Sequence, residues 1–113
     1  MLTVEKLKAF GADVDEGLTR CLNNEAFYLR LVAKALADGN FDGLKKAVDA
    51  GDFGAAFEAA HALKGVLGNL SITPLYDMAS NITELLRANE SADYQALTDE
   101  LLKKRAQLTE LCE

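Results

Sequence analysis

Histidine occurs once in this chain of 113 residues, at position 61, inside the segment Ala60-His61-Ala62-Leu63-Lys64-Gly65. Apolar residues recur around it at spacings of three and four, which predicts an amphipathic helix with one buried face. The predicted buried positions are Phe53, Ala56, Ala60, Leu63, Leu67 and Leu70. Because a helix turns by about 100° per residue, His61 points almost opposite Leu63 and Leu70. The sequence therefore predicts an imidazole that meets solvent.

The exposed side of this predicted helix has the composition of a reactive site. His61 shares a stripe with Gly54, Glu58, Gly65 and Gly68, and Lys64 lies at its flank. A neutral imidazole is a nucleophile that can accept a group and later pass it on. Lys64 follows His61 by three residues and is therefore its neighbour on the helix surface. A lysine ammonium is well suited to hold phosphoryl oxygens, so the pair predicts phosphoryl transfer.

Two glycines on the same stripe need a physical reason. Gly65 and Gly68 lie inside the predicted helix, where each costs about 1 kcal/mol relative to alanine. Absent side chains would let a partner protein approach His61 closely, as in-line phosphoryl transfer requires. Close helix packing is the alternative, but both glycines face away from the apolar stripe. We expect Gly65, Gly68, Glu58 and Phe57 to contact the partner, although Phe57 also suits the edge of the core.

Composition limits the other functions. Half of the residues are hydrophobic, 27% are charged, and there is one proline, which predicts a single all-helical domain over residues 1–113. A net charge of -6 disfavours nucleic acid as a partner. Charges interrupt the apolar stretches before they reach the length of a membrane span, and no signal peptide precedes the first helix. Cys21 and Cys112 lack metal-binding or redox spacing, so we expect two reduced thiols and a cytoplasmic protein.

Cofactor sites are also not expected. A metal site in a helical bundle needs several inward carboxylates or histidines, and His61 faces outward. No glycine-rich loop for ATP is present, so we expect a carrier of phosphoryl groups without kinase activity of its own.

Turn and capping residues divide the chain into helices. We expect four main helices at 25–38, 41–70, 74–89 and 92–112, the second bent or broken near Gly51, packed as antiparallel neighbours. The segments before Cys21 are expected to cover one end of the bundle. Asn24, Thr73 and Ser91 are the predicted N-caps.

The segment His61-Ala62-Leu63-Lys64-Gly65, preceded by Ala59-Ala60, resembles the signature of histidine-containing phosphotransfer (HPt) domains of multistep two-component phosphorelays. Residues 11–20, 27–31 and 51–53 are similar to the usual lead-in to the histidine helix of this family, and the resemblance covers roughly residues 10–110. It implies an antiparallel up-down-up-down four-helix bundle with short extra N-terminal helices. It also implies a histidine that takes a phosphoryl group from the aspartate of one receiver domain and gives it to another.

Carried over to this chain, the resemblance makes His61 the phospho-acceptor, Lys64 the phosphoryl-stabilising cation and Gly65 the small residue that gives access. The implied partners are receiver domains of response regulators or hybrid histidine kinases. Mg²⁺ is expected on the receiver, and no cofactor is expected on this chain, which we expect to be a monomer.

One position departs from the family. Ser71 stands where a glycine usually follows the histidine by ten residues, and we expect it to alter the next turn more than the chemistry. The initial Met and complete helix caps favour a stand-alone protein. A non-catalytic helical module that docks receivers without transfer is the alternative.

Overall fold

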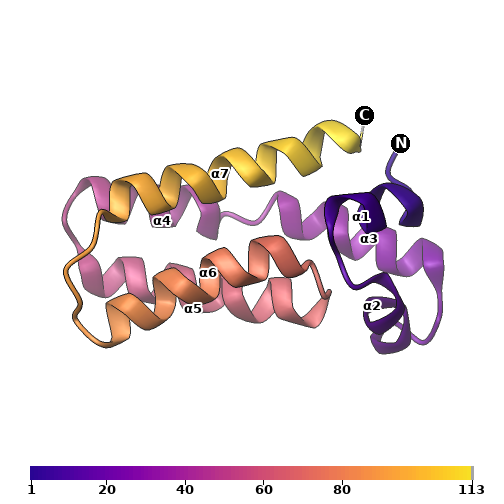
Figure 1. Cartoon of the computed structure of the whole chain (residues 1–113), viewed down its shortest axis with the longest axis horizontal. Coiled ribbons are helices and arrows are strands. Elements are labelled where there is room, and N and C mark those ends of the chain that lie inside the picture. Colours follow the sequence, from indigo (N-terminus) through magenta and orange to yellow (C-terminus); the bar gives the residue numbers. More distant parts are fainter. Residues whose placement is uncertain (113) are drawn as a thin grey trace.

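A computed structural model describes residues 1–112, which form seven helices and no strand (Figure 1). The helices are α1 (Val4–Phe10), α2 (Val14–Arg20), α3 (Glu25–Leu36), α4 (Asn40–Asp49), α5 (Phe53–Asn69), α6 (Thr73–Arg87) and α7 (Tyr94–Leu111). The predicted all-α class is confirmed. None of these helices is both long and apolar enough to cross a bilayer.

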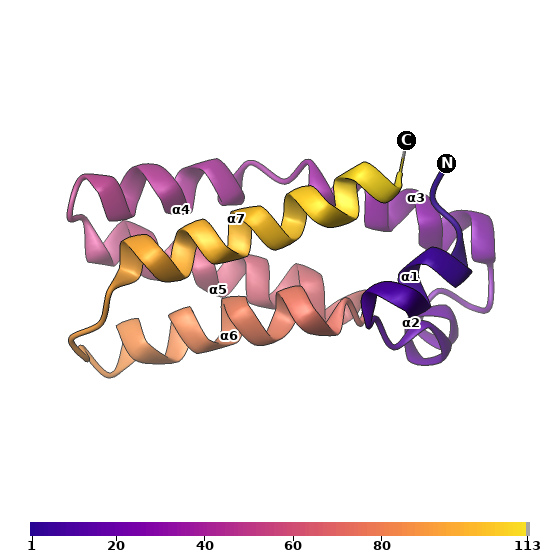
Figure 2. The same cartoon turned by 45° about the horizontal axis from the view of Figure 1, so that its top comes forward.

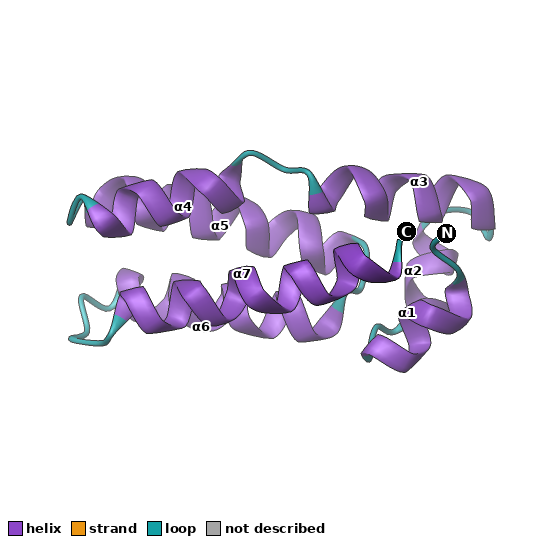
Figure 3. Cartoon of the chain, turned by 90° about the horizontal axis from the view of Figure 1, so that it is seen from above, coloured by secondary structure: helices purple, strands orange, loops and turns teal. Residues whose placement is uncertain are grey.

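Helices α4 to α7 form an antiparallel up-down-up-down bundle, in which each helix packs on the next and α7 packs back on α4. Helix α3 follows the line of α4 beyond the bundle, separated from it by a short connection (Figure 3). Helices α1 and α2 cover the end of the bundle beside α3, as predicted, and the two ends of the chain meet there (Figure 2). The Lys6 ammonium donates to the Leu111 carbonyl at 3.1 Å across this junction.

The break predicted near Gly51 is confirmed, but the expectation that residues 41–70 make a single member of the bundle is wrong. Gly51 has a φ of +70°, a left-handed conformation that glycine adopts at little cost, and the chain reverses there. The Asp52 side chain then accepts a hydrogen bond from the Ala55 amide and starts α5. Helices α4 and α5 are therefore two antiparallel members of the bundle, and α3, expected as a main member, is an extension of α4.

The bundle core is built from one apolar face of each helix. Fully buried side chains include Leu44 of α4, Leu63 and Leu67 of α5, Ile82 of α6 and Leu101 of α7. The predicted buried stripe of α5 is confirmed except at its first position. Phe53 is half exposed, because it lies in the first turn at the end of the bundle, where its ring lies 5.3 Å from that of Tyr94.

Two of the three predicted N-caps are also wrong. Asn24 caps α3 as predicted by accepting from the Phe27 amide at 3.0 Å. Thr73 is already the first residue of α6, so the cap position falls on Ile72, which has no side-chain acceptor. Helix α7 is capped by Asp93 rather than Ser91, because its first helical residue is the buried Tyr94.

Tyr28 ties the N-terminal helices to the bundle. Its buried hydroxyl donates to the Leu70 carbonyl at the end of α5, at 2.8 Å. Burial raises the pKa of Tyr28 to about 12, so the hydroxyl keeps the proton that it donates. The ring packs directly on Gly17 of α2. Cys21 is buried nearby, and both Cys21 and Cys112 are thiols, as predicted.

Candidate functional site

His61 lies midway along α5 and is exposed, whereas Leu63 on the opposite face is fully buried. The helical phase read from the sequence is therefore correct. Gly65, one turn after His61, is also exposed, and a Cβ atom built there would meet nothing within 4 Å. The surface beside the imidazole is open to an approaching molecule.

The Lys64 ammonium lies on the α6 side of this surface. It donates to a Glu84 carboxylate oxygen at 3.2 Å. The other carboxylate oxygen of Glu84 accepts from Arg87 at 3.0 Å. Both hydrogen bonds lower the pKa of the Glu84 carboxyl, and the bond from Lys64 has the larger effect. Two cations and one carboxylate therefore form a charged cluster next to His61.

Phe57 links this cluster back to the imidazole. Its ring centroid lies 5.6 Å from that of His61 in an edge-on arrangement, and the Arg87 guanidinium lies 5.1 Å from its ring centroid. Phe57 is partly buried against the core, so it lies at the core edge while contacting the imidazole. Glu58 is exposed on the turn before His61.

A cleft of about 620 Å³ opens along one side of His61. It is lined from α5 by His61, Lys64, Gly65 and Gly68, from α6 by Tyr76 and Asp77, and from α2 by Glu16 and Arg20, among others. Phe57 and Glu58 are outside this lining. The predicted site residues thus divide into a cleft group, which includes the imidazole and the ammonium, and a pair on the preceding turn.

The two glycines of the stripe serve different purposes. Gly65 is open, which fits the access argument. At Gly68 a Cβ atom would lie 3.0 Å from the Tyr76 ring of α6, so this glycine allows the two helices to pack closely. The close-packing alternative therefore accounts for the glycine at position 68, although Gly68 also lines the cleft. The helical phase gave its direction but did not identify Tyr76 as its neighbour.

Metal binding has no structural support in the part of the chain that is described. Residues 1–112 contain no cluster of three or more histidine, cysteine, aspartate or glutamate side chains placed to hold an ion.

Comparison with known families agrees with this geometry. A family model described as the Hpt domain matches residues 29–113, which is most of the chain. The chain belongs to the Hpt domain family. Hpt domains are phosphocarrier modules of phosphorelays that interact with receiver domains, and they are not kinases. No curated protein and no solved structure matched the chain significantly.

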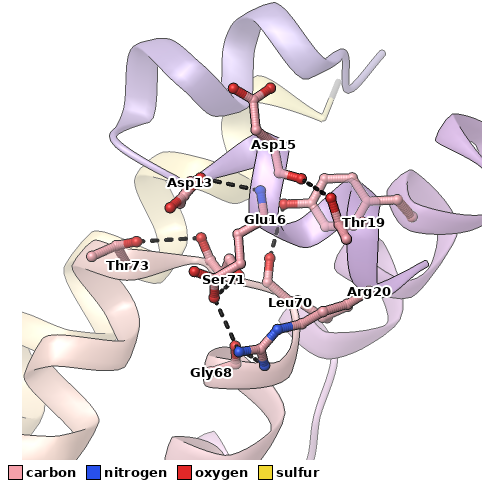
Figure 4. A network of polar contacts seen from close by, with 10 residues as sticks. Asp13, Asp15, Glu16, Thr19, Arg20, Gly68, Leu70, Ser71 and Thr73 are labelled. Atoms are coloured by element: carbon pink, nitrogen blue, oxygen red, sulfur yellow. Dashed lines mark hydrogen bonds and ion pairs between the residues drawn. The ribbon is translucent and has the colours of Figure 1, made fainter. Parts of the chain in front are cut away.

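In this Hpt domain, the match begins after α1 and α2, yet α2 forms one wall of the cleft. Figure 4 shows how α2 is attached there. The Ser71 hydroxyl donates to a Glu16 carboxylate oxygen at 2.9 Å, and Arg20 pairs with the same oxygen at 3.1 Å. Arg20 also donates to the Gly68 carbonyl at 3.2 Å, so α2 is bonded to the last turn of the histidine helix.

The departure from the family at Ser71 has a local explanation. Ser71 has a φ of +55°, a left-handed conformation that costs residues other than glycine about 1 kcal/mol or more. Its position after the end of α5 is therefore one that favours glycine. The serine is buried, and its hydrogen bond to Glu16 offsets part of that cost.

Several of these residues were not identified from the sequence. Glu84 and Arg87 are spaced three apart on the polar face of an amphipathic helix, which identifies a surface ion pair but not the helix that it faces. Glu16 and Arg20 are four apart on α2 and carry the same general signal. Only the packing of α2 and α6 against α5 brings these pairs to His61.

Proposed function

We propose that this chain relays a phosphoryl group between receiver-domain aspartates through His61. The observation that carries the proposal is that the exposed His61 lines one cleft together with Lys64 and the open position at Gly65. Its membership of a family of phosphocarrier modules supports the same function.

The transfer is a substitution at phosphorus. The unprotonated ring nitrogen of His61 attacks the phosphorus of an aspartyl phosphate on the docked receiver. A nitrogen–phosphorus bond forms, the bond between phosphorus and the aspartate oxygen breaks, and its electron pair leaves with the receiver carboxylate. The reverse reaction passes the group to a second receiver. Lys64 neutralises phosphoryl oxygens during both steps, as expected for a reaction that depends on positioning and charge.

The surface around His61 is the proposed docking site. Gly65 leaves room for the receiver, and Phe57, Glu58 and the backbone at Gly68 border the approach. We propose that Mg²⁺ in this complex is held by the receiver and that this chain supplies no cofactor. We further propose a monomeric, single-domain carrier over residues 1–113 that acts in the cytoplasm, without nucleic acid or membrane as a partner.

The experiment is a reconstituted relay. A receiver domain encoded near this chain is phosphorylated with radiolabelled acetyl phosphate, freed of the donor and mixed with the chain. We expect label to move to the chain within minutes, to be labile in acid and stable in alkali, and to move on when a second receiver is added. If the chain took label from none of the receivers encoded near it, the proposal would be contradicted.

The non-catalytic alternative is separated by the same mixture. A docking module would bind the receiver, as measured by calorimetry, without taking label from it. The proposal requires both binding and transfer.

A further inference from the structure

The Lys64 ammonium is already engaged in the unphosphorylated protein. It lies 3.2 Å from a Glu84 oxygen, and its side chain is only 25% exposed. Glu84 lies on α6, the neighbour of α5 in the bundle, so the pair joins the histidine helix to the next one. The cation assigned to the phosphoryl group therefore has a competing anion within reach.

We propose that Glu84 is a positioning residue that holds Lys64 away from full engagement with the phosphoryl group and thereby limits the stability of the phosphorylated state. This inference rests on the proposed function of His61. It adds a determinant on a second helix that acts through Lys64 and does not touch the reacting atoms.

The surroundings of Glu84 fit such an exchange. A phosphoryl group on His61 carries up to two negative charges, whereas the Glu84 carboxylate carries one, so the phosphoryl group is the stronger competitor for Lys64. Arg87 remains on the other Glu84 oxygen at 3.0 Å, so the carboxylate keeps a partner when Lys64 leaves. An exposed ion pair changes an equilibrium by about fivefold at most, which makes the exchange easily reversible. A carrier that must both accept and release its group requires such a balance.

The test measures the second ionisation of the phosphoryl group. The chain is phosphorylated with phosphoramidate, a small donor that needs no receiver, and the ³¹P resonance is followed against pH. When Lys64 is released from Glu84, its positive charge favours the dianion of the phosphoryl group. Glu84→Gln should therefore lower the pH midpoint of this ionisation by about 0.5, which is a threefold increase in the ionisation constant. Lys64→Gln should raise it. Glu100→Gln, which removes an exposed charge from α7, is the control and should leave it unchanged within about 0.1.

The combined variant decides whether Glu84 acts through Lys64. If it does, Glu84→Gln should shift the midpoint much less in the Lys64→Gln background than in the wild type. An equal shift in both backgrounds, or no shift in the wild type, overturns the inference. Since this measurement uses no receiver, its failure is distinct from failure of the proposed function, which appears as absence of label in the relay.

Discussion

Gly65→Gln should leave the protein folded and reduce phosphoryl transfer from a receiver by about 100-fold or more. The position is open, since a Cβ atom there meets nothing within 4 Å, so a glutamine fits without disturbing the bundle. Its side chain would project into the space one turn from His61 that the incoming phosphoryl group needs. Displacing a reacting group by about 1 Å costs roughly this factor. The initial rate of label transfer and the circular dichroism melting curve are the measurements.

Gly43→Gln is the matched control for that change. Gly43 lies in α4, away from the cleft, and a Cβ atom there also meets nothing within 4 Å. Both substitutions replace a helical glycine and should raise stability by up to about 1 kcal/mol. Only the change at Gly65 should slow transfer. Equal transfer rates in the two variants would show that access at Gly65 is not what the glycine provides.

Gly17→Ala should destabilise the fold by about 2 kcal/mol and lower the Tm by about 8 °C. An added Cβ atom would lie 2.6 Å from three atoms of the Tyr28 phenol, which is too close for any real contact. The buried ring would have to move, and its hydrogen bond to the Leu70 carbonyl would be strained or lost. This outcome opposes the intrinsic preference of helices for alanine, so the sign of the change tests the packing directly. Urea unfolding followed by circular dichroism gives the free energy.

The corresponding control is Gly43→Ala, where the open position allows the helix preference to act alone. We expect this variant to be more stable than the wild type by up to about 1 kcal/mol. If Gly17→Ala were also stabilising, the contact between α2 and Tyr28 would be wrong, and with it the attachment of the N-terminal helices to α5.

The candidate site could be predicted from the sequence to the extent that it lies on one helix. The spacing of Leu63, Leu67 and Leu70 fixes which side of α5 is buried, and the exposure of His61 and Gly65 follows from rotation alone. The neighbour relation of His61 and Lys64 is equally local. For this reason the central part of the site could be proposed without coordinates.

Contacts between helices could not be predicted in this way. Gly51 marks an interruption in the helical pattern, but the sequence does not distinguish a bend there from the full reversal that makes α4 and α5 antiparallel partners. The contact of Gly68 with Tyr76 and the pairing of Lys64 with Glu84 both depend on how α6 is shifted along α5. Single-helix periodicity contains no information about that shift.

The most direct test of the account is whether the phosphoryl group reaches His61 itself. The wild type and His61→Gln, confirmed to be equally folded by circular dichroism, are incubated with the same phosphorylated receiver, and protein-bound label is measured after acid and after alkali. We predict label on the wild type that is lost in acid and kept in alkali, and none on His61→Gln. Label of the same kind and amount on His61→Gln would contradict the account.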